Sequence, residues 1–169
     1  MATVQENLLD WLRDAHAMEQ QVEKMLKAQS ERLENYPVLK QRIVQHIEET
    51  CEQRELLEGC LNRLGSSPST LKDIGGKLMA FGQAVGGMTM SDEVVKGAMS
   101  GYVFENIEIA MYTVLFEAAR LAGDTETQRA CEQILPQEIA MADWLREHLP
   151  QITAAFLQRS ENPHAQAKR

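Results

Sequence analysis

The chain has 169 residues, of which 44% are apolar and 25% charged, so it is long enough for one domain with a buried core. Helix-forming Ala, Leu, Met, Glu and Gln are plentiful, whereas aromatic residues make up only 5% of the chain, which excludes an ordinary β fold. The 25 acidic residues outnumber the 17 basic ones, and a net charge of −8 repels phosphate backbones, so we expect no nucleic-acid binding.

The ends and the cysteines of the chain indicate a cytoplasmic protein. The opening "MATVQENLLDWLRDAH" lacks a basic segment followed by an apolar run, so we expect no signal peptide. The stretch "LMAFGQAVGGMTM" is too short to span a bilayer, so we expect no membrane partner. Cys51, Cys60 and Cys131 form no C-x-x-C pair, and an odd number of cysteines is typical of reduced thiols in a cytosol.

Two long helices are predicted in the first part of the chain. A capping box, in which Thr3 precedes Glu6 by three residues, opens the first. Its pattern fades before "NYP" at 35–37, where Pro37 can begin a second helix that ends at Gly65. The apolar stripe of the first helix has helical spacing and consists of Leu8, Leu12, Ala15, Val22 and Leu26.

A long crossover separates these helices from the next. The stretch "SSPS" at 66–69 is typical of a linker, and residues 70–88 are predicted to form a short helix, weakened by glycines, and a loop. Ser91 or Asp92 is the expected N-cap of a third long helix, because acidic residues follow in its first turn. This helix is expected to run to Gly123.

The last part of the chain predicts a fourth long helix. It follows the turn "GDTETQ" and is expected to end at about Pro150, with a short fifth helix at 151–158. Pro136 falls inside the fourth helix and is expected to kink it. The polar residues 159–169 are interpreted as a C-terminal tail, which leaves 1–158 as the single domain.

The order of these elements predicts an all-α fold. Four long helices form two hairpins, and a crossover of about 25 residues, containing a short helix, connects the second helix to the third. One long crossover of this kind is the connection scheme of ferritin-like four-helix bundles. We therefore expect a ferritin-like bundle.

Glutamates lie on or beside the apolar stripe of every long helix. Glu19 precedes Glu49 by 30 residues, and Glu108 precedes Glu138 by the same interval, so antiparallel hairpins place each pair at similar heights. Buried carboxylates must be paired, protonated or coordinated, and bound cations would stabilise a converging set. Oxygen-rich ligation suits iron or manganese, two ions at most. The candidate ligands are Glu19, Glu49, Glu108 and Glu138, with Glu105, His46 and Gln53 as auxiliaries.

Each candidate also has an interpretation without metal. The glutamates could lie on flanking faces and pair with Lys or Arg. His16 and His46 could be residues at a helix edge, or they could hydrogen-bond a ligand without binding the metal themselves. Tyr112 is typical of a core aromatic residue whose hydroxyl bonds a carboxylate. Cys51 is interpreted mainly as a small buried side chain.

Several segments of the sequence resemble the ferritin-like YciE/YciF family of bacterial stress-response proteins, and YciE most closely. They are "DWLRDAHAMEQQ", "IVQHIEETCEQ", "SDEVVKGAMSGYVFENIEIAMYTVL", "MADWL" and "FLQRSE". The resemblance implies a ferritin-like bundle, a homodimer, a role in stress and metal binding inferred from the fold.

The chain departs from the Glu-x-x-His motif of di-iron bundles. Three residues after Glu48, Glu49 and Glu138 stand Cys51, Glu52 and Met141, and none of these is a histidine.

Histidines instead precede glutamates, in His16-x-x-Glu19 and His46-x-x-Glu49. Two hypotheses therefore stand: a di-metal centre of iron or manganese, or a non-enzymatic dimeric stress protein with a degenerate, metal-free site. An iron-storage cage is a third, less favoured, hypothesis, and neither a substrate nor catalytic residues are assigned.

Overall fold

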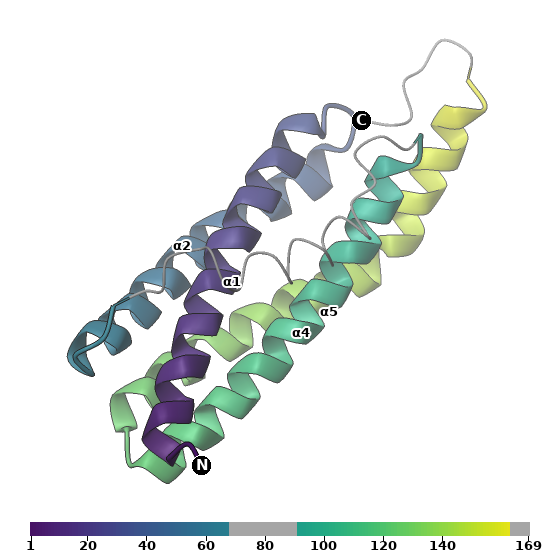
Figure 1. Cartoon of the computed structure of the whole chain (residues 1–169). Helices are drawn as coiled ribbons and strands as arrows, with labels where there is room; N and C mark the ends of the chain where they lie inside the picture. The colour runs from purple at the N-terminus through teal and green to yellow at the C-terminus, as the bar shows by residue number, and fades with distance from the viewer. Residues whose placement is uncertain (68–90, 163–169) are drawn as a thin grey trace.

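The computed structural model describes residues 1–67 and 91–162, which form an all-α bundle. Within these residues the helices are α1 (Val4–Arg32), α2 (Pro37–Arg63), α4 (Glu93–Ala122) and α5 (Thr125–Ser160), as Figure 1 shows. The predicted four-helix bundle, with its long crossover between the second and third long helices, is confirmed. The short helix predicted within 70–88 lies outside the described residues.

The four helices pack as two hairpins. Helix α1 lies against α2 and helix α4 against α5, and the hairpins meet where α1 contacts α4 and α2 contacts α5 (Figure 1). No helix in the described part of the chain has the length and apolar character needed to cross a bilayer. The core between the helices includes the fully buried side chains Leu8, Leu12, Leu39, Leu57, Leu115 and Ile134.

Several of the local signals that begin and end the helices act as the sequence predicts, although Asp92, the N-cap of α4, makes no side-chain cap bond. The backbone N–H of Thr3 donates to Glu6 Oε2 at 2.7 Å, and the N–H of Glu6 donates to Thr3 Oγ1 at 3.2 Å, which completes the capping box. Pro37 is the first residue of α2. Gly65 and Gly123 adopt φ angles of 70° and 71°, a conformation that favours glycine, where the chain leaves α2 and α4.

The end of the fourth long helix differs from its prediction. Helix α5 continues through Pro136 and Pro150 to Ser160, so the predicted end near Pro150 and the separate helix at 151–158 are wrong. A proline removes one backbone hydrogen bond, but packing beyond it continues, because Ile152 is buried and Phe156 contacts the core. Tertiary packing therefore outweighs the local helix-breaking signal.

An ion pair joins the end of α2 to the start of α5. Arg63 Nη2 donates to both oxygens of Asp124 at 2.6 Å, and Asp124 Oδ1 also accepts from the N–H of Thr127 at 3.2 Å as the N-cap of α5. Burial would raise the pKa of the Asp124 carboxyl, but the hydrogen bonds from Arg63 and Thr127 outweigh it and hold the pKa below its usual 3.8.

Replacing Asp124 with alanine should therefore destabilise the bundle by about 1–2 kcal/mol at pH 7, chiefly through loss of the cap. Because its pKa is lowered on folding, the carboxylate stabilises the fold above its unfolded pKa and loses this effect as the pH falls through the folded pKa. Urea unfolding at pH 7 and below pH 3 should show a difference between wild type and Asp124→Ala that shrinks at low pH.

Asp10→Ala provides the control for this measurement. Asp10 also pairs with an arginine, Arg13, but its side chain is 67% exposed, so the change should stay within ~0.5 kcal/mol at either pH. An Asp124→Ala protein as stable as wild type at pH 7 would contradict the assignment.

Candidate metal centre

The inward face of α2 carries polar residues in the middle of its apolar series. His46 and Gln53 are 0% and 1% exposed and lie in line with the buried Ile43, Thr50 and Leu57. These residues recur every three or four positions, so they share one helix face. A buried imidazole and a buried amide therefore point between the helices.

The other hairpin places carboxylates opposite that face. Glu105 and Glu108 are three residues apart on α4, and Glu138 lies on α5. All three are at most 1% exposed, because they occupy positions of the same stripes that bury Leu115 and Ile134. The packing of the helices therefore buries these three predicted residues.

Four of the inward residues converge on one point. His46, Glu105, Glu108 and Glu138 each offer a ligand atom, and these four atoms lie within 4.8 Å of one another. Nε2 of His46 lies 3.1 Å from Glu105 Oε2 and 3.8 Å from Glu138 Oε2. Three helices, α2, α4 and α5, thus supply the atoms of this group, which we call the four-residue centre.

Glu19 of α1 lies inside the bundle but outside the four-residue centre. It is fully buried, and its Oε1 accepts the hydroxyl proton of Tyr112, as expected for a core tyrosine. Its charge acts on the carboxyls of Glu108 and Glu138. The predicted inward position of Glu19 is therefore observed, while its role as a ligand stays a prediction.

Glu49 has a different position from the other predicted ligands. It precedes the buried Thr50 by one residue, so it lies at the edge of the α2 stripe, and its side chain is 17% exposed. Its Oε2 lies 2.7 Å from His46 Nδ1 and 3.1 Å from Arg42 Nη1. Glu49 is therefore outside the four-residue centre, behind the ring of His46, and α2 supplies the imidazole instead.

Gln53 and Gln137 support the centre between α2 and α5. Nε2 of Gln53 donates to Oε1 of Glu138 and, at 2.9 Å, to Oε1 of Gln137. Sequence reasoning named Gln53 but missed Gln137, which has no position on the apolar stripe. Only the packing of α2 against α5 reveals this contact, so the sequence carried no signal for it.

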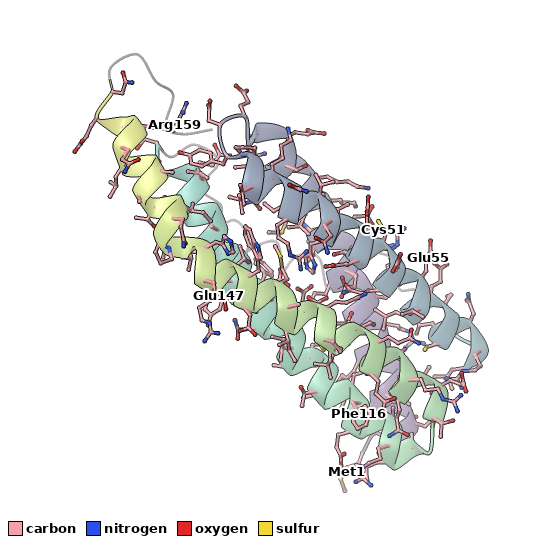
Figure 2. All side chains as sticks on the ribbon, turned by 180° about the vertical axis from the view of Figure 1, so that it is seen from behind. Met1, Cys51, Glu55, Phe116, Glu147 and Arg159 are labelled. Carbon is pink, nitrogen blue, oxygen red and sulfur yellow. The ribbon has the colours of Figure 1, made fainter. Side chains whose placement is uncertain are left out.

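The remaining candidates lie away from the four-residue centre. His16 is buried in α1 and its two ring nitrogens have no hydrogen-bond partner among the described residues. Met141 is a buried apolar residue, and Cys51 is half-buried near Glu23. Figure 2 shows Cys51 at the outer side of α2, on the same helix as Glu55. None of these residues replaces the missing Glu-x-x-His histidines.

Several buried atoms around the centre have no hydrogen-bond partner. An unsatisfied buried polar group costs about 1–3 kcal/mol, so a cluster of them is unusual. Within the described part of the chain these atoms are His46 Nε2, Gln53 Oε1 and the Oε2 atoms of Glu19, Glu105, Glu108 and Glu138. His46 Nε2 and Glu105 Oε2 lie 3.1 Å apart as an ion pair but do not form a hydrogen bond.

The spacing of these atoms fits one cation. Oxygen and nitrogen ligands lie about 2.0–2.6 Å from a divalent ion, so opposite ligands are roughly 4–5 Å apart. The 4.8 Å spread of the four-residue centre is at the upper end of that range. Three carboxylates and one imidazole, each with an unused atom, could therefore bind an ion with little movement.

Burial and mutual repulsion raise the pKa values of the carboxyl groups. Removal from water raises the pKa of Glu138 to about 9 and that of Glu19 to about 7, and it raises the pKa of Glu108 well above its usual range. Burial lowers the pKa of His46, but the charge of Glu105 and contacts with Glu49 outweigh it, and the pKa rises to about 10. Without metal, bound protons therefore neutralise the carboxyl groups of Glu108 and Glu138.

These pKa values predict how the metal-free protein responds to pH. A carboxyl whose pKa rises from 4.5 to about 9 on folding binds its proton more tightly in the folded state. Stability then falls as the pH rises between those values, by up to ~1.4 kcal/mol per pH unit for each group. Urea unfolding in a chelator should show lower stability at pH 9 than at pH 5.

Glu138→Gln separates this effect from a general response to pH. Glutamine does not ionise, so the slope of stability against pH should be shallower in this variant. Glu48→Gln, at an exposed neighbour of Glu49, should keep the wild-type slope. Equal slopes in all three proteins would show that Glu138 does not titrate in this range.

Comparison with known proteins places the chain in a family. Protein XCC3681 of Xanthomonas campestris pv. campestris has 45% sequence identity and a TM-score of 0.82, over 94% of this chain and 99% of that one. YcfI of Rhodopseudomonas palustris has 29% identity and a TM-score of 0.72, over 86% and 94% of the two chains.

A more distant match shows the fold alone. The Escherichia coli stress protein YciF has 20% identity and a TM-score of 0.76, over 89% of this chain and 97% of its own.

The model of a family described as a domain of unknown function, DUF892, matches residues 3–158. The chain therefore belongs to the DUF892 family.

Proposed function

We propose that this protein binds iron or manganese at the four-residue centre and acts in a bacterial stress response. The observation that carries the proposal is the cluster of buried ligand atoms on His46, Glu105, Glu108 and Glu138 that lack a hydrogen bond. A cation there would neutralise charges that otherwise require protons, and it would use each of the four unpaired atoms.

The donor set favours iron or manganese over softer metals. Carboxylate oxygens suit hard ions, and one imidazole extends the choice to iron. Such an ion would supply Lewis acidity and, for iron or manganese, one-electron redox chemistry. The chain itself holds the ion with four side chains, orients Glu138 through Gln53 and excludes water by packing.

The number of ions depends on residues beyond the four-residue centre. His46, Glu105, Glu108 and Glu138 are sufficient for one ion. A second would need additional oxygens, and the unpaired atoms nearby belong to Glu19 and Gln53. We therefore propose one ion at the centre, with a second only if Glu19 contributes.

A metal-free role is the second candidate, and specific contacts favour it. Glu19 accepts from Tyr112 and Glu138 accepts from Gln53, so two carboxyl groups have donors without any ion. The raised carboxyl pKa values would keep protons in the bundle at neutral pH. A polar core of this kind would specify how the helices align, as a non-enzymatic stress protein requires.

The stress role is supported by one of the structural matches. YciF, which shares the fold, is a stress protein, and the family match covers most of the chain. The closer resemblance to YciE stays a prediction.

Metal uptake tests the proposed centre. Protein purified without chelator and then loaded with Fe²⁺ or Mn²⁺ should retain close to one ion per chain by elemental analysis. Binding at 100 times Kd should stabilise the fold by ~2.7 kcal/mol, measured by urea unfolding. Less than ~0.1 ion per chain with no stabilisation would favour the metal-free candidate.

A double variant shows whether the retained ion is at this position. Glu105→Gln with Glu138→Gln should abolish uptake, since it removes two of three carboxylates, yet remain folded because glutamine has the same shape. The exposed pair Glu48→Gln with Glu52→Gln makes the same change of charge and should bind as wild type does. Uptake by both double variants would place the ion elsewhere.

We also propose that the protein is a homodimer, and exposed apolar residues on α4 support this. Four large residues point to one side of the helix, because at ~100° per residue they fall within ~60° of its circumference. An apolar stripe on a helix surface is typical of an interface, and a two-fold dimer would bury the same stripe of both copies. The residues are Met99, Val103, Val114 and Leu121.

Two valines with equal exposure test this surface. Val103 on α4 and Val44 on α2 are both 42% exposed. Light scattering coupled to gel filtration should give a dimer mass for wild type and Val44→Glu, and a monomer mass for Val103→Glu. A dimeric Val103→Glu protein would contradict the proposed surface, and a monomeric wild type would contradict the dimer.

A further inference from the structure

A row of bonded side chains runs along α2 from the helix edge to the four-residue centre. Arg42 Nη1 donates to Glu49 Oε2 at 3.1 Å, and Gln45 Nε2 donates to Glu49 Oε1 at 3.0 Å. Glu49 Oε2 also lies 2.7 Å from His46 Nδ1. The opposite ring nitrogen, Nε2, faces Glu105 and Glu138.

The spacing of these residues explains their contacts. Arg42, Gln45, His46 and Glu49 fall at positions i, i+3, i+4 and i+7, so they share one side of α2. Helical side chains lean toward the N-terminus, so Glu49 leans back over the turn that carries His46. The order His-x-x-Glu therefore brings the carboxylate behind the ring rather than into the centre.

Both oxygens of Glu49 are already occupied. Oε2 contacts His46 and Arg42, and Oε1 accepts from Gln45. Glu105, Glu108 and Glu138, in contrast, each keep one oxygen without a hydrogen bond among the described residues. For Glu105 and Glu138 that oxygen has only the ion-pair contact with His46 Nε2, at 3.1 and 3.8 Å. Binding an ion through Glu49 would break contacts, whereas binding through the other three would complete their coordination.

We propose that Glu49 is a positioning residue that holds the His46 ring with Nδ1–H toward itself and Nε2 toward the ion. Metal-binding histidines commonly donate their second ring N–H to a carboxylate, which fixes the ring and the nitrogen left for the ion. Arg42 holds Glu49 in turn. The metal-dependent half of this inference rests on the proposed function, while the orientation of His46 does not.

The metal-free protein tests the orientation directly. With ¹⁵N-labelled histidine, the Nδ1–H proton of His46 should give a resonance protected from solvent exchange, assigned by its loss in His46→Asn. It should persist in Glu48→Ala, whose substituted side chain is an exposed neighbour, and disappear in Glu49→Ala. The same protected resonance in Glu49→Ala would overturn the proposal.

Titration with Mn²⁺ alone tests the second half. Glu49→Ala should raise Kd about 10- to 100-fold at an unchanged number of ions per chain, the usual effect of removing a carboxylate behind a ligand. Glu49→Gln keeps an acceptor oxygen, so its Kd should rise less than tenfold, and Glu48→Ala should match wild type.

The two proposals fail in different ways. A loss of one ion per chain in Glu49→Ala would make Glu49 a ligand and overturn its positioning role. No Mn²⁺ uptake by wild type would overturn the proposed function, and the protected Nδ1–H resonance would still decide whether Glu49 orients His46.

Discussion

The free energy of burying carboxyl groups governs the middle of this bundle. Glu19, Glu105, Glu108 and Glu138 are all inaccessible to water, and a buried ionised carboxylate without a partner is too costly to persist. The fold therefore requires something positive between its helices. Protons and the imidazole of His46 are sufficient in the metal-free chain, and a cation would replace the protons.

The rest of the molecule keeps that polar region buried and holds the helices in alignment. Apolar side chains such as Leu12 and Leu57 fill the bundle, and the Arg63–Asp124 ion pair fixes one end of α2 against α5. Donors from neighbouring helices, Tyr112 and Gln53, reach one oxygen each of Glu19 and Glu138. The second oxygen of each of these two carboxyls has no hydrogen bond among the described residues, so it is available to an ion.

Most of the fold could be predicted from the sequence, because its signals are local and agree with one another. The capping box at Thr3, the proline that starts α2 and the glycine at 123 mark helix ends through backbone chemistry alone. The continuation of α5 past Pro150 could not be predicted in this way, since it depends on the burial of Ile152 against other helices.

The sequence predicts which face of each helix lines the candidate site, but it does not predict every residue that reaches the centre. On α1, α4 and α5 the glutamates coincide with the apolar stripe, so spacing alone places them inward. On α2, His46 and Glu49 are three residues apart and differ by about 60° around the helix. Which of the two faces the centre depends on how α2 packs against the other helices, and the pattern within α2 does not contain that information.

An anomalous-difference map from crystals loaded with Mn²⁺ would test the central claim most directly. We expect one strong peak about 2.0–2.6 Å from His46 Nε2 and from oxygens of Glu105, Glu108 and Glu138, with Glu49 still bonded to His46 Nδ1. A map without a peak inside the bundle, from crystals shown to take up manganese, would contradict it.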